Sequence, residues 1–264
     1  MIIELKDLKL CARNPLEFYC KKTLGIYLPE KEEKEEKEFL ISPLQRSFFR
    51  KSSSPEALLA VAANRGRLPT GSFKDIASLK IKEEERERRQ MYQEWQIKPE
   101  EKFAIEMRDH PIEGVGTFSG VIEELSPKGL IVHAADKLPD LIRIWPLFLV
   151  VLASGKADSL LLAKDGKIKQ APKEDPKKLL VDYLTYMQWA LEELSPLMPN
   201  WAASLLRGTK AEFESKVEEQ EDDDETLKWL RHRSPPLSPR ELFDAWAEKL
   251  RAHFAPFLRW EEGQ

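Results

Sequence analysis

The chain is poor in the residue types that mark several large classes of protein. Its 264 residues include only 2 cysteines and 4 histidines, too few for a disulfide framework and without the spacing of a structural zinc site. The longest apolar run, 145–153, is far below the roughly 20 residues that span a bilayer. The 42 basic side chains face 46 acidic ones, giving a net charge of −4, whereas free-standing duplex-DNA binders are usually basic. Any contact with nucleic acid must therefore be local or shared with partners.

The common catalytic motifs are absent as well. The GxG formed by Gly114 and Gly116 lacks the GK[ST] that completes a phosphate-binding loop, and no GxSxG nucleophile elbow occurs. Cys11 and Cys20 lie in apolar helical contexts, which favours reduced, buried thiols and an intracellular protein. The opening MIIELKDLKL carries charges within its apolar stretch and does not read as a signal peptide. We expect a cytoplasmic protein without membrane contact.

What the chain does contain is enough for a substantial core. Seven Trp and twelve Phe accompany 42% hydrophobic and 33% charged residues, which is typical of a globular protein. Apolar periodicity predicts helices, then strands, then helices. We divide the chain into a helical N-terminal part, 1–100, and a sheet-and-helix core with C-terminal helices, 101–264, which together form one compact domain. The charged segments Glu30–Glu38 and Glu218–Glu225 are interpreted as solvated.

Local signals place the elements. Asn14 followed by Pro15 predicts the start of a helix, and Ser238 with Glu241 forms a capping box. Asp165-Gly166 between apolar segments predicts a hairpin. The expected helices cover 5–11, 16–24, 56–65, 74–96, 140–153, 177–194 and 239–254, with Pro146 able to begin or kink one of them, and the expected strands cover 103–107, 118–125, 130–133 and 159–163.

The segment Phe118–Ala135, FSGVIEELSPKGLIVHAA, holds the chemistry that remains to be considered. It predicts two strands joined by a polar turn. Metal-dependent phosphodiester hydrolysis needs acids converging on divalent cations and a lysine or metal-bound water that activates the nucleophile. An acid on one strand can meet an acid on the next, with a lysine two residues further on the same face.

Only the first of these residues is present. Glu123 occupies the position of the first acid, whereas His133 stands for the second acid and Ala135 for the lysine. Asp136 and Lys137 lie just beyond, but neighbouring strand residues point to opposite faces and cannot replace an acid and a lysine two apart. We therefore interpret Glu123, His133 and Ala135 as a degenerate site with no catalytic residue, no metal and no cofactor.

Several ordered motifs resemble one family. LCARNPLEFYCKKTLGIYL matches an opening "basic-x-Pro-x-x-aromatic … Leu-Gly" helix, and GRLPTGSFKDI matches a "Gly-x-Leu-Pro-x-Gly-x-Phe-Gly" turn except that Lys74 replaces the last glycine. FLISPLQRSFF, FSGVIEELSPKGLI, LFLVVLASG and LLLAKDGK occur in the family's order. The chain resembles the C-terminal domain of the gamma subunit of exodeoxyribonuclease V, the RecC protein of the RecBCD helicase-nuclease.

The resemblance implies a fold, a role and partners. The fold would be α/β (α+β), of the restriction-endonuclease-like PD-(D/E)XK kind, with a mixed central sheet flanked by helices and added helical segments. The chain would be a catalytically inactive nuclease-like module for double-strand break repair and recombination. It would help split duplex DNA, guide the strands and hold RecB-like and RecD-like subunits. The related AddB-like branch is disfavoured, because its iron–sulfur cysteine corresponds to Asn14 and the further cysteines are absent.

Two alternatives remain open from the residues. The first is a divergent metal-dependent DNA exonuclease that uses Glu123, His133 and Asp136 with Mg²⁺. It predicts these three side chains within about 6 Å of a common point. The second is a protein-interaction module with no role on DNA, which predicts a surface without a basic groove.

Overall fold

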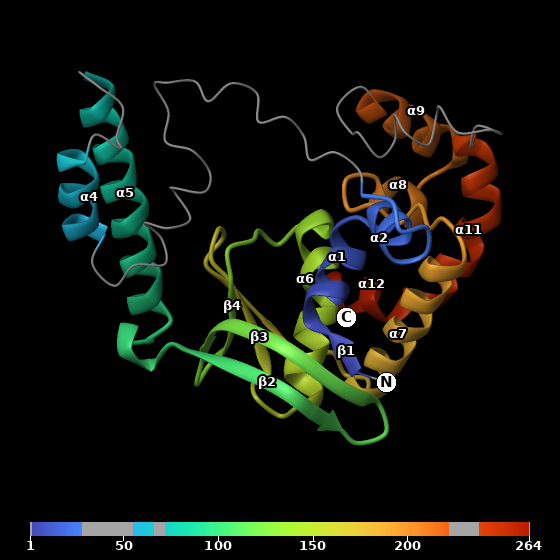
Figure 1. Ribbon diagram of the computed structural model, residues 1–264, viewed down its shortest axis with the longest axis horizontal. Coiled ribbons are helices and arrows are strands. Elements are labelled where there is room, and N and C mark those ends of the chain that lie inside the picture. The colour runs from blue at the N-terminus through green and yellow to red at the C-terminus, as the bar shows by residue number, and fades with distance from the viewer. Residues whose placement is uncertain (1, 28–54, 66–71, 222–237, 264) are drawn as a thin grey trace. The chain divides into compact units, whose positions relative to one another are not determined.

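The computed structural model describes residues 2–27, 55–65, 72–221 and 238–263 (Figure 1). The chain divides into two compact units: Met1–Glu30 with Phe103–Gln264, and Lys31–Lys102. The expected helical part, 1–100, is therefore shared between both units. The charged segment 30–38, the FLISPLQRSFF motif, residues 66–71 of the GRLPTGSFKDI motif and residues 222–225 of the acidic segment lie outside the described residues.

The larger unit is built on a mixed six-stranded sheet. Its strands are β1 Ile2–Glu4, β2 Phe103–Ile112, β3 Gly116–Ser126, β4 Gly129–Val132, β5 Ser159–Leu162 and β6 Lys167–Gln170. β2, β3 and β4 form an antiparallel meander, β5 runs parallel to β4 after a helical crossover, and β6 returns antiparallel. β1 pairs in parallel with β3. The hairpin signal at Asp165-Gly166 is confirmed, since it joins β5 to β6.

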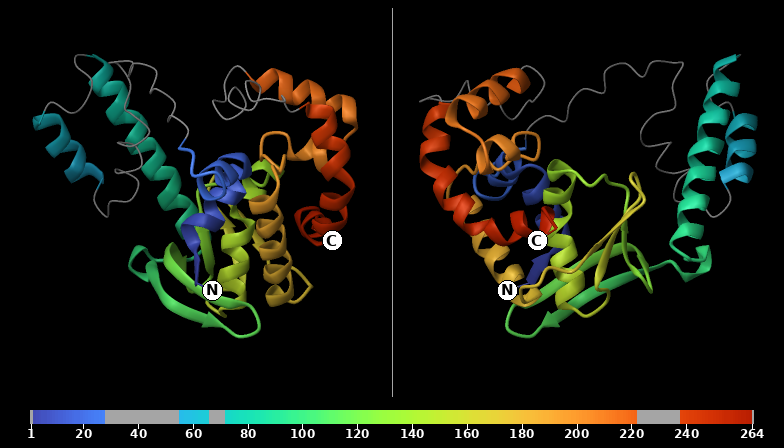
Figure 2. Two further views of the ribbon diagram at one scale, coloured as in Figure 1. Left: turned by 45° about the vertical axis from the view of Figure 1, so that its right-hand side comes forward. Right: turned by 180° about the vertical axis from the view of Figure 1, so that it is seen from behind.

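The described helices of the larger unit are α1 Leu5–Arg13, α2 Pro15–Lys22, α6 Leu138–Ala153, α7 Pro176–Glu192, α8 Ala202–Leu206, α9 Lys210–Glu221, α11 Pro239–His253 and α12 Ala255–Glu261. α1 contacts the sheet at β1 and β3. α6, the β4–β5 crossover, packs against both α1 and α7, and Figure 2 shows these three helices grouped beside the sheet.

The helix starts follow the local signals. The Asn14 side chain accepts a hydrogen bond of 3.0 Å from the Glu17 amide, and both halves of the Ser238–Glu241 capping box are formed. Pro146 lies inside α6, which begins at Leu138, earlier than the sequence indicated.

One apolar cluster joins the sheet to these helices. In β5, Leu160 and Leu162 belong to this cluster. Leu161, which alternation places on the opposite face, is also completely buried. The last helices are part of the same core: the Trp260 ring lies 4.9 Å from Trp145 and 5.6 Å from Phe148, between ring centroids. The C-terminal helices therefore complete the domain rather than extend from it.

The smaller unit is helical within its described residues. It contains α4 Pro55–Asn64, α5 Ser72–Glu94 and the 3₁₀ turn η1 Pro99–Glu101. Leu59 and Ile81 form its buried apolar contact. On α5, Glu85 binds Arg89 one turn away at 2.9 Å, the acid-to-base pairing that its sequence predicts.

The protein is thus an α/β protein with a mixed sheet flanked by helices, as the resemblance implied. Among the residues that the structure describes, no helix is both long and apolar enough to cross a membrane.

Candidate functional site

Strand β3 carries the first expected site residue, Glu123, at an irregularity. Phe103 of β2 pairs with Leu125, but Ile105 pairs with Ile122, so β3 has one residue more than β2 over this interval. Ile122 and Leu125 are both completely buried although they lie three positions apart, and Glu124 has a positive φ of 56°. These features define a β-bulge at Glu123 and Glu124. The bulge keeps both glutamates out of the apolar core.

Strand β4 separates from β3 before it reaches Glu123. The ladder between the two strands consists of Leu125 with Leu130 and Ser126 with Gly129. Beyond Leu130, the pairing of β4 is with β5, up to Val132 and Leu162. The period-two register that aligned Glu123 with the second strand therefore does not extend that far.

The HAA triplet lies beyond the end of β4. His133 is exposed, whereas Ala135 is only 7% exposed. The Ala135 amide donates 2.9 Å to an Asp140 carboxylate oxygen in the first turn of α6, and the Ala134 carbonyl accepts 3.1 Å from the Lys164 amide. The place expected for a catalytic lysine is thus a buried small residue whose amide is bonded to α6, and the preceding Ala134 is bonded to the β5–β6 turn.

The three residues of the active-nuclease alternative do not form a metal site. In residues 2–27, 55–65, 72–221 and 238–263, no group of three or more His, Cys, Asp or Glu side chains is arranged to hold a metal ion. Glu123, His133 and Asp136 all lie within these ranges. The cluster that this alternative requires is therefore not formed by them.

Asp136 instead forms ion pairs with β6. Its carboxylate lies 2.9 Å from the Lys167 ammonium and 3.2 Å from that of Lys169, and its amide donates to the Asp165 carboxylate. Burial raises the pKa of the Asp136 carboxyl, but the hydrogen bonds from Lys167 and Lys169 outweigh it and hold the pKa below its ordinary value. At neutral pH, Asp136 is therefore ionised and forms ion pairs with the two lysines.

Asp140 is the centre of a second set of ion pairs, next to the set around Asp136. Its carboxylate accepts the hydrogen bond from the Ala135 amide and lies 3.7 Å from Lys164 and 3.8 Å from Arg143. Arg143 also donates 3.1 Å to the Asn200 side chain. Since residues 135 and 136 are adjacent in the chain, both groups meet where β4 and β5 end and α6 begins. We call Arg143, Lys164, Lys167 and Lys169, with the two aspartates that hold them, the cationic cluster.

Sequence reasoning missed most of this cluster. It considered Asp136 only as a metal ligand and read Lys164–Lys167 only as a turn. The alternation of Lys167 and Lys169 on either side of Ile168 was a usable signal, because it places two lysines on one face of a strand. The partnership with residues about 30 positions earlier depends on the β4–β5 pairing, which no local pattern specifies.

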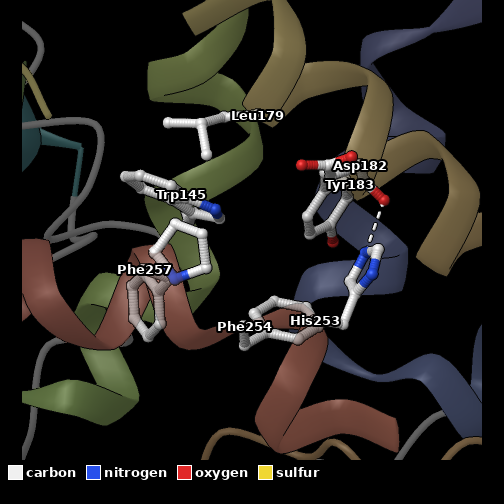
Figure 3. Close-up of a pocket in the computed structure, with 8 residues that line it drawn as sticks. Trp145, Leu179, Asp182, Tyr183, His253, Phe254 and Phe257 are labelled. Atoms are coloured by element: carbon white, nitrogen blue, oxygen red, sulfur yellow. Dashed lines mark hydrogen bonds between the residues drawn. The ribbon is translucent and has the colours of Figure 1, made fainter. Parts of the chain in front are cut away.

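A separate aromatic pocket lies between α6, α7, α11 and α12 (Figure 3). Trp145, Phe254 and Phe257 line it, and His253 Nε2 donates 2.6 Å to the Asp182 carbonyl. Its cavity volume of about 10 Å³ is at the lower limit for one water molecule. The pocket is therefore a packing defect of the core and not a substrate site.

Cys11 and Cys20 are both buried, as the sequence predicted, and neither forms a disulfide. Burial raises the pKa of the Cys11 thiol to about 12, so it stays protonated at neutral pH and is a poor nucleophile.

Fold and site together define an α/β domain with a mixed sheet, in which lysine–aspartate pairs lie where β4 and β5 end. A model of the RecC C-terminal domain family matches residues 2–210. The chain belongs to the RecC C-terminal domain family, which implies a role in the RecBCD complex of DNA repair. Comparisons with curated proteins and with solved structures found no significant match.

Proposed function

We propose that the chain is a catalytically inactive nuclease-like module of a helicase-nuclease complex. It helps split duplex DNA, guides the separated strands and holds RecB-like and RecD-like subunits in the cytoplasm. The observation that carries the proposal is the HAA triplet: His133 and Ala135 stand where a second acid and a lysine are needed. The buried position of Ala135 and its bond to Asp140 add weight, because no long cationic side chain fits there without rearrangement.

We also propose that the sheet is of the restriction-endonuclease-like, PD-(D/E)XK kind. The β2–β3–β4 meander, the crossover helix α6 and the parallel strand β5 support this, since the two expected ligand strands are consecutive and the helix follows the second. In such a sheet an open crevice forms outside the carboxyl ends of the parallel strands. The cationic cluster occupies this place.

A nuclease assay tests the loss of activity. The purified chain is incubated with linear DNA and Mn²⁺ or Mg²⁺, next to the Glu123→Ala variant. We expect no degradation by either protein above the metal-only blank. Metal-dependent degradation that disappears in Glu123→Ala would show instead an active nuclease.

Co-purification tests the role in a complex. The chain is expressed together with RecB-like and RecD-like subunits and isolated by a tag on one of them. We expect the chain to be retained on the tagged subunit at physiological salt. Its absence from the purified complex would contradict the proposed role as a module of that complex.

A further inference from the structure

The cationic cluster is layered, with its acids beneath its cations. The Asp136 and Asp140 side chains are only 19% and 22% exposed, whereas those of Lys164, Lys167 and Arg143 are 47%, 58% and 42% exposed. A ligand that approaches from solvent therefore meets ammonium and guanidinium groups first. The aspartates act from below and hold these groups in position.

The cluster also carries an excess of positive charge. Each aspartate is shared by two cations: Asp136 by Lys167 and Lys169, and Asp140 by Lys164 and Arg143. The exposed Asp165 and Lys137 at the same place offset one another. In a chain of net charge −4, such a local excess is the kind of feature that directs an anion to one surface.

Its place in the fold is one where ligands bind. The cluster lies at the carboxyl ends of the parallel strands β4 and β5 and at the first turn of α6, where open α/β sheets form their binding crevices. Lysines and an arginine on neighbouring elements can each bind a phosphate oxygen, so together they can contact successive phosphates of one backbone. An acidic chain suits a single strand better than a duplex, whose charge density is about twice as high.

We propose that the cationic cluster of Arg143, Lys164, Lys167 and Lys169 binds the phosphodiester backbone of single-stranded nucleic acid. The inference rests on the proposed function and names the surface through which a separated strand is guided. Lys169 is only 12% exposed, donates to the Glu261 carbonyl and lies 5.1 Å from the Trp260 ring centroid. It therefore orients Asp136, while Lys164, Lys167 and Arg143 contact phosphates.

Fluorescence anisotropy of a labelled single-stranded oligonucleotide tests the proposal. The full chain and the Lys164→Gln/Lys167→Gln variant are titrated at several salt concentrations. The matched control is Lys6→Gln/Lys216→Gln, which removes two other exposed lysines, of which Lys216 is ion-paired to Glu219. Each lost phosphate contact lowers the slope of log affinity against log salt by about 0.7. We expect a decrease of about 1.4 for the cluster variant and little change for the control.

Each other outcome overturns the inference. Absence of binding by the parent chain, or equal slopes for the two variants, would show that the cluster is not the binding surface. Loss of co-purification with partner subunits by the cluster variant, with DNA binding unchanged, would assign the surface to a protein partner. None of these results would show nuclease activity, so the inference about the cationic cluster can fail while the proposed function stands. Degradation of DNA by the parent chain would instead contradict the proposed function. Thermal unfolding of both variants checks that they are folded.

Discussion

The substitution Asp136→Asn tests how much the ion pairs of the cationic cluster stabilise the fold, and it raises the positive charge of the cluster. Asparagine keeps the shape of the side chain and removes its negative charge, so Lys167 and Lys169 lose their ionic partner. The pair with Lys167, whose side chain is 58% exposed, is screened by solvent and contributes little. The pair with the better-buried Lys169 is worth about 1.5 kcal/mol, as for a hydrogen bond between charged groups. Lys169 retains the Glu261 carbonyl, and we expect a net loss of about 1.5 kcal/mol, almost all from the Lys169 pair.

The pH dependence of this loss has a defined sign. The pKa of Asp136 lies below its ordinary value of 3.8 in the folded protein. Its ion pairs therefore add stability that is fully present above pH 3.8 and is lost as the pH falls through the folded pKa. The stability difference between the parent chain and Asp136→Asn should be constant near neutral pH and should shrink below pH 3.8.

Urea unfolding at several pH values, followed by circular dichroism, measures this difference. The matched control is Glu219→Gln, which breaks the exposed ion pair with Lys216 on α9 and should change stability by no more than about 0.5 kcal/mol. Since Asp136→Asn also raises the charge of the cationic cluster, single-stranded DNA should bind it more tightly. A variant as stable as the parent chain at neutral pH, or a difference that grows in acid, would refute the reasoning.

Three further predictions concern the buried residues Ala135, Trp260 and Cys11. Ala135→Lys should destabilise the fold by about 2 kcal/mol in urea titrations, whereas Ala211→Lys, at an exposed position, should be neutral; an Ala135→Lys variant as stable as the parent chain would show that this buried position accepts a long side chain. Trp260→Ala should cost about 3–5 kcal/mol in the same titrations, although it lies beyond the family match, and a small effect would mean that α12 is not part of the core. Cys11, with a pKa of about 12, should react with a thiol reagent at neutral pH only after unfolding, and rapid labelling of the native protein would show that it is accessible.

The sequence predicted the larger elements because their causes are local. The cap at Asn14 and the capping box at Ser238 begin the expected helices, and alternation found β2 while turn residues found the β5–β6 hairpin. The helical start at Leu138, two residues before the expected one, differs because Lys137 is an N-cap without a capping side chain. The remaining signals of this start are Pro139 and Asp140 in the first turn, and they fix it less sharply than a capping side chain does.

The hairpin was predicted in outline and missed in detail. Strand alternation assumed an uninterrupted ladder that aligns Glu123 with the second strand, but the pairing of β3 with β4 ends at Leu125 and Leu130. The bulge at Glu124 and the departure of β4 toward β5 depend on Ile122, Leu125 and Leu162 all entering one core. Burial of these residues, which are distant in the chain, outweighs the regular pairing of neighbouring strands. A short stretch of sequence does not include all of these residues, so the bulge could not be predicted from it.

By itself, the sequence determined that residues 133–135 are His, Ala and Ala, since residue identities do not depend on folding, and it predicted that an acid and a lysine are missing there. Only the tertiary structure decided what takes their place. Pairing of β4 with β5 and of β5 with β6 brings Lys164, Lys167 and Lys169 to Asp136 and Asp140. These contacts span about 30 positions of chain and are set by the order of strands in the sheet, which is why the cationic cluster could be found only in the folded protein.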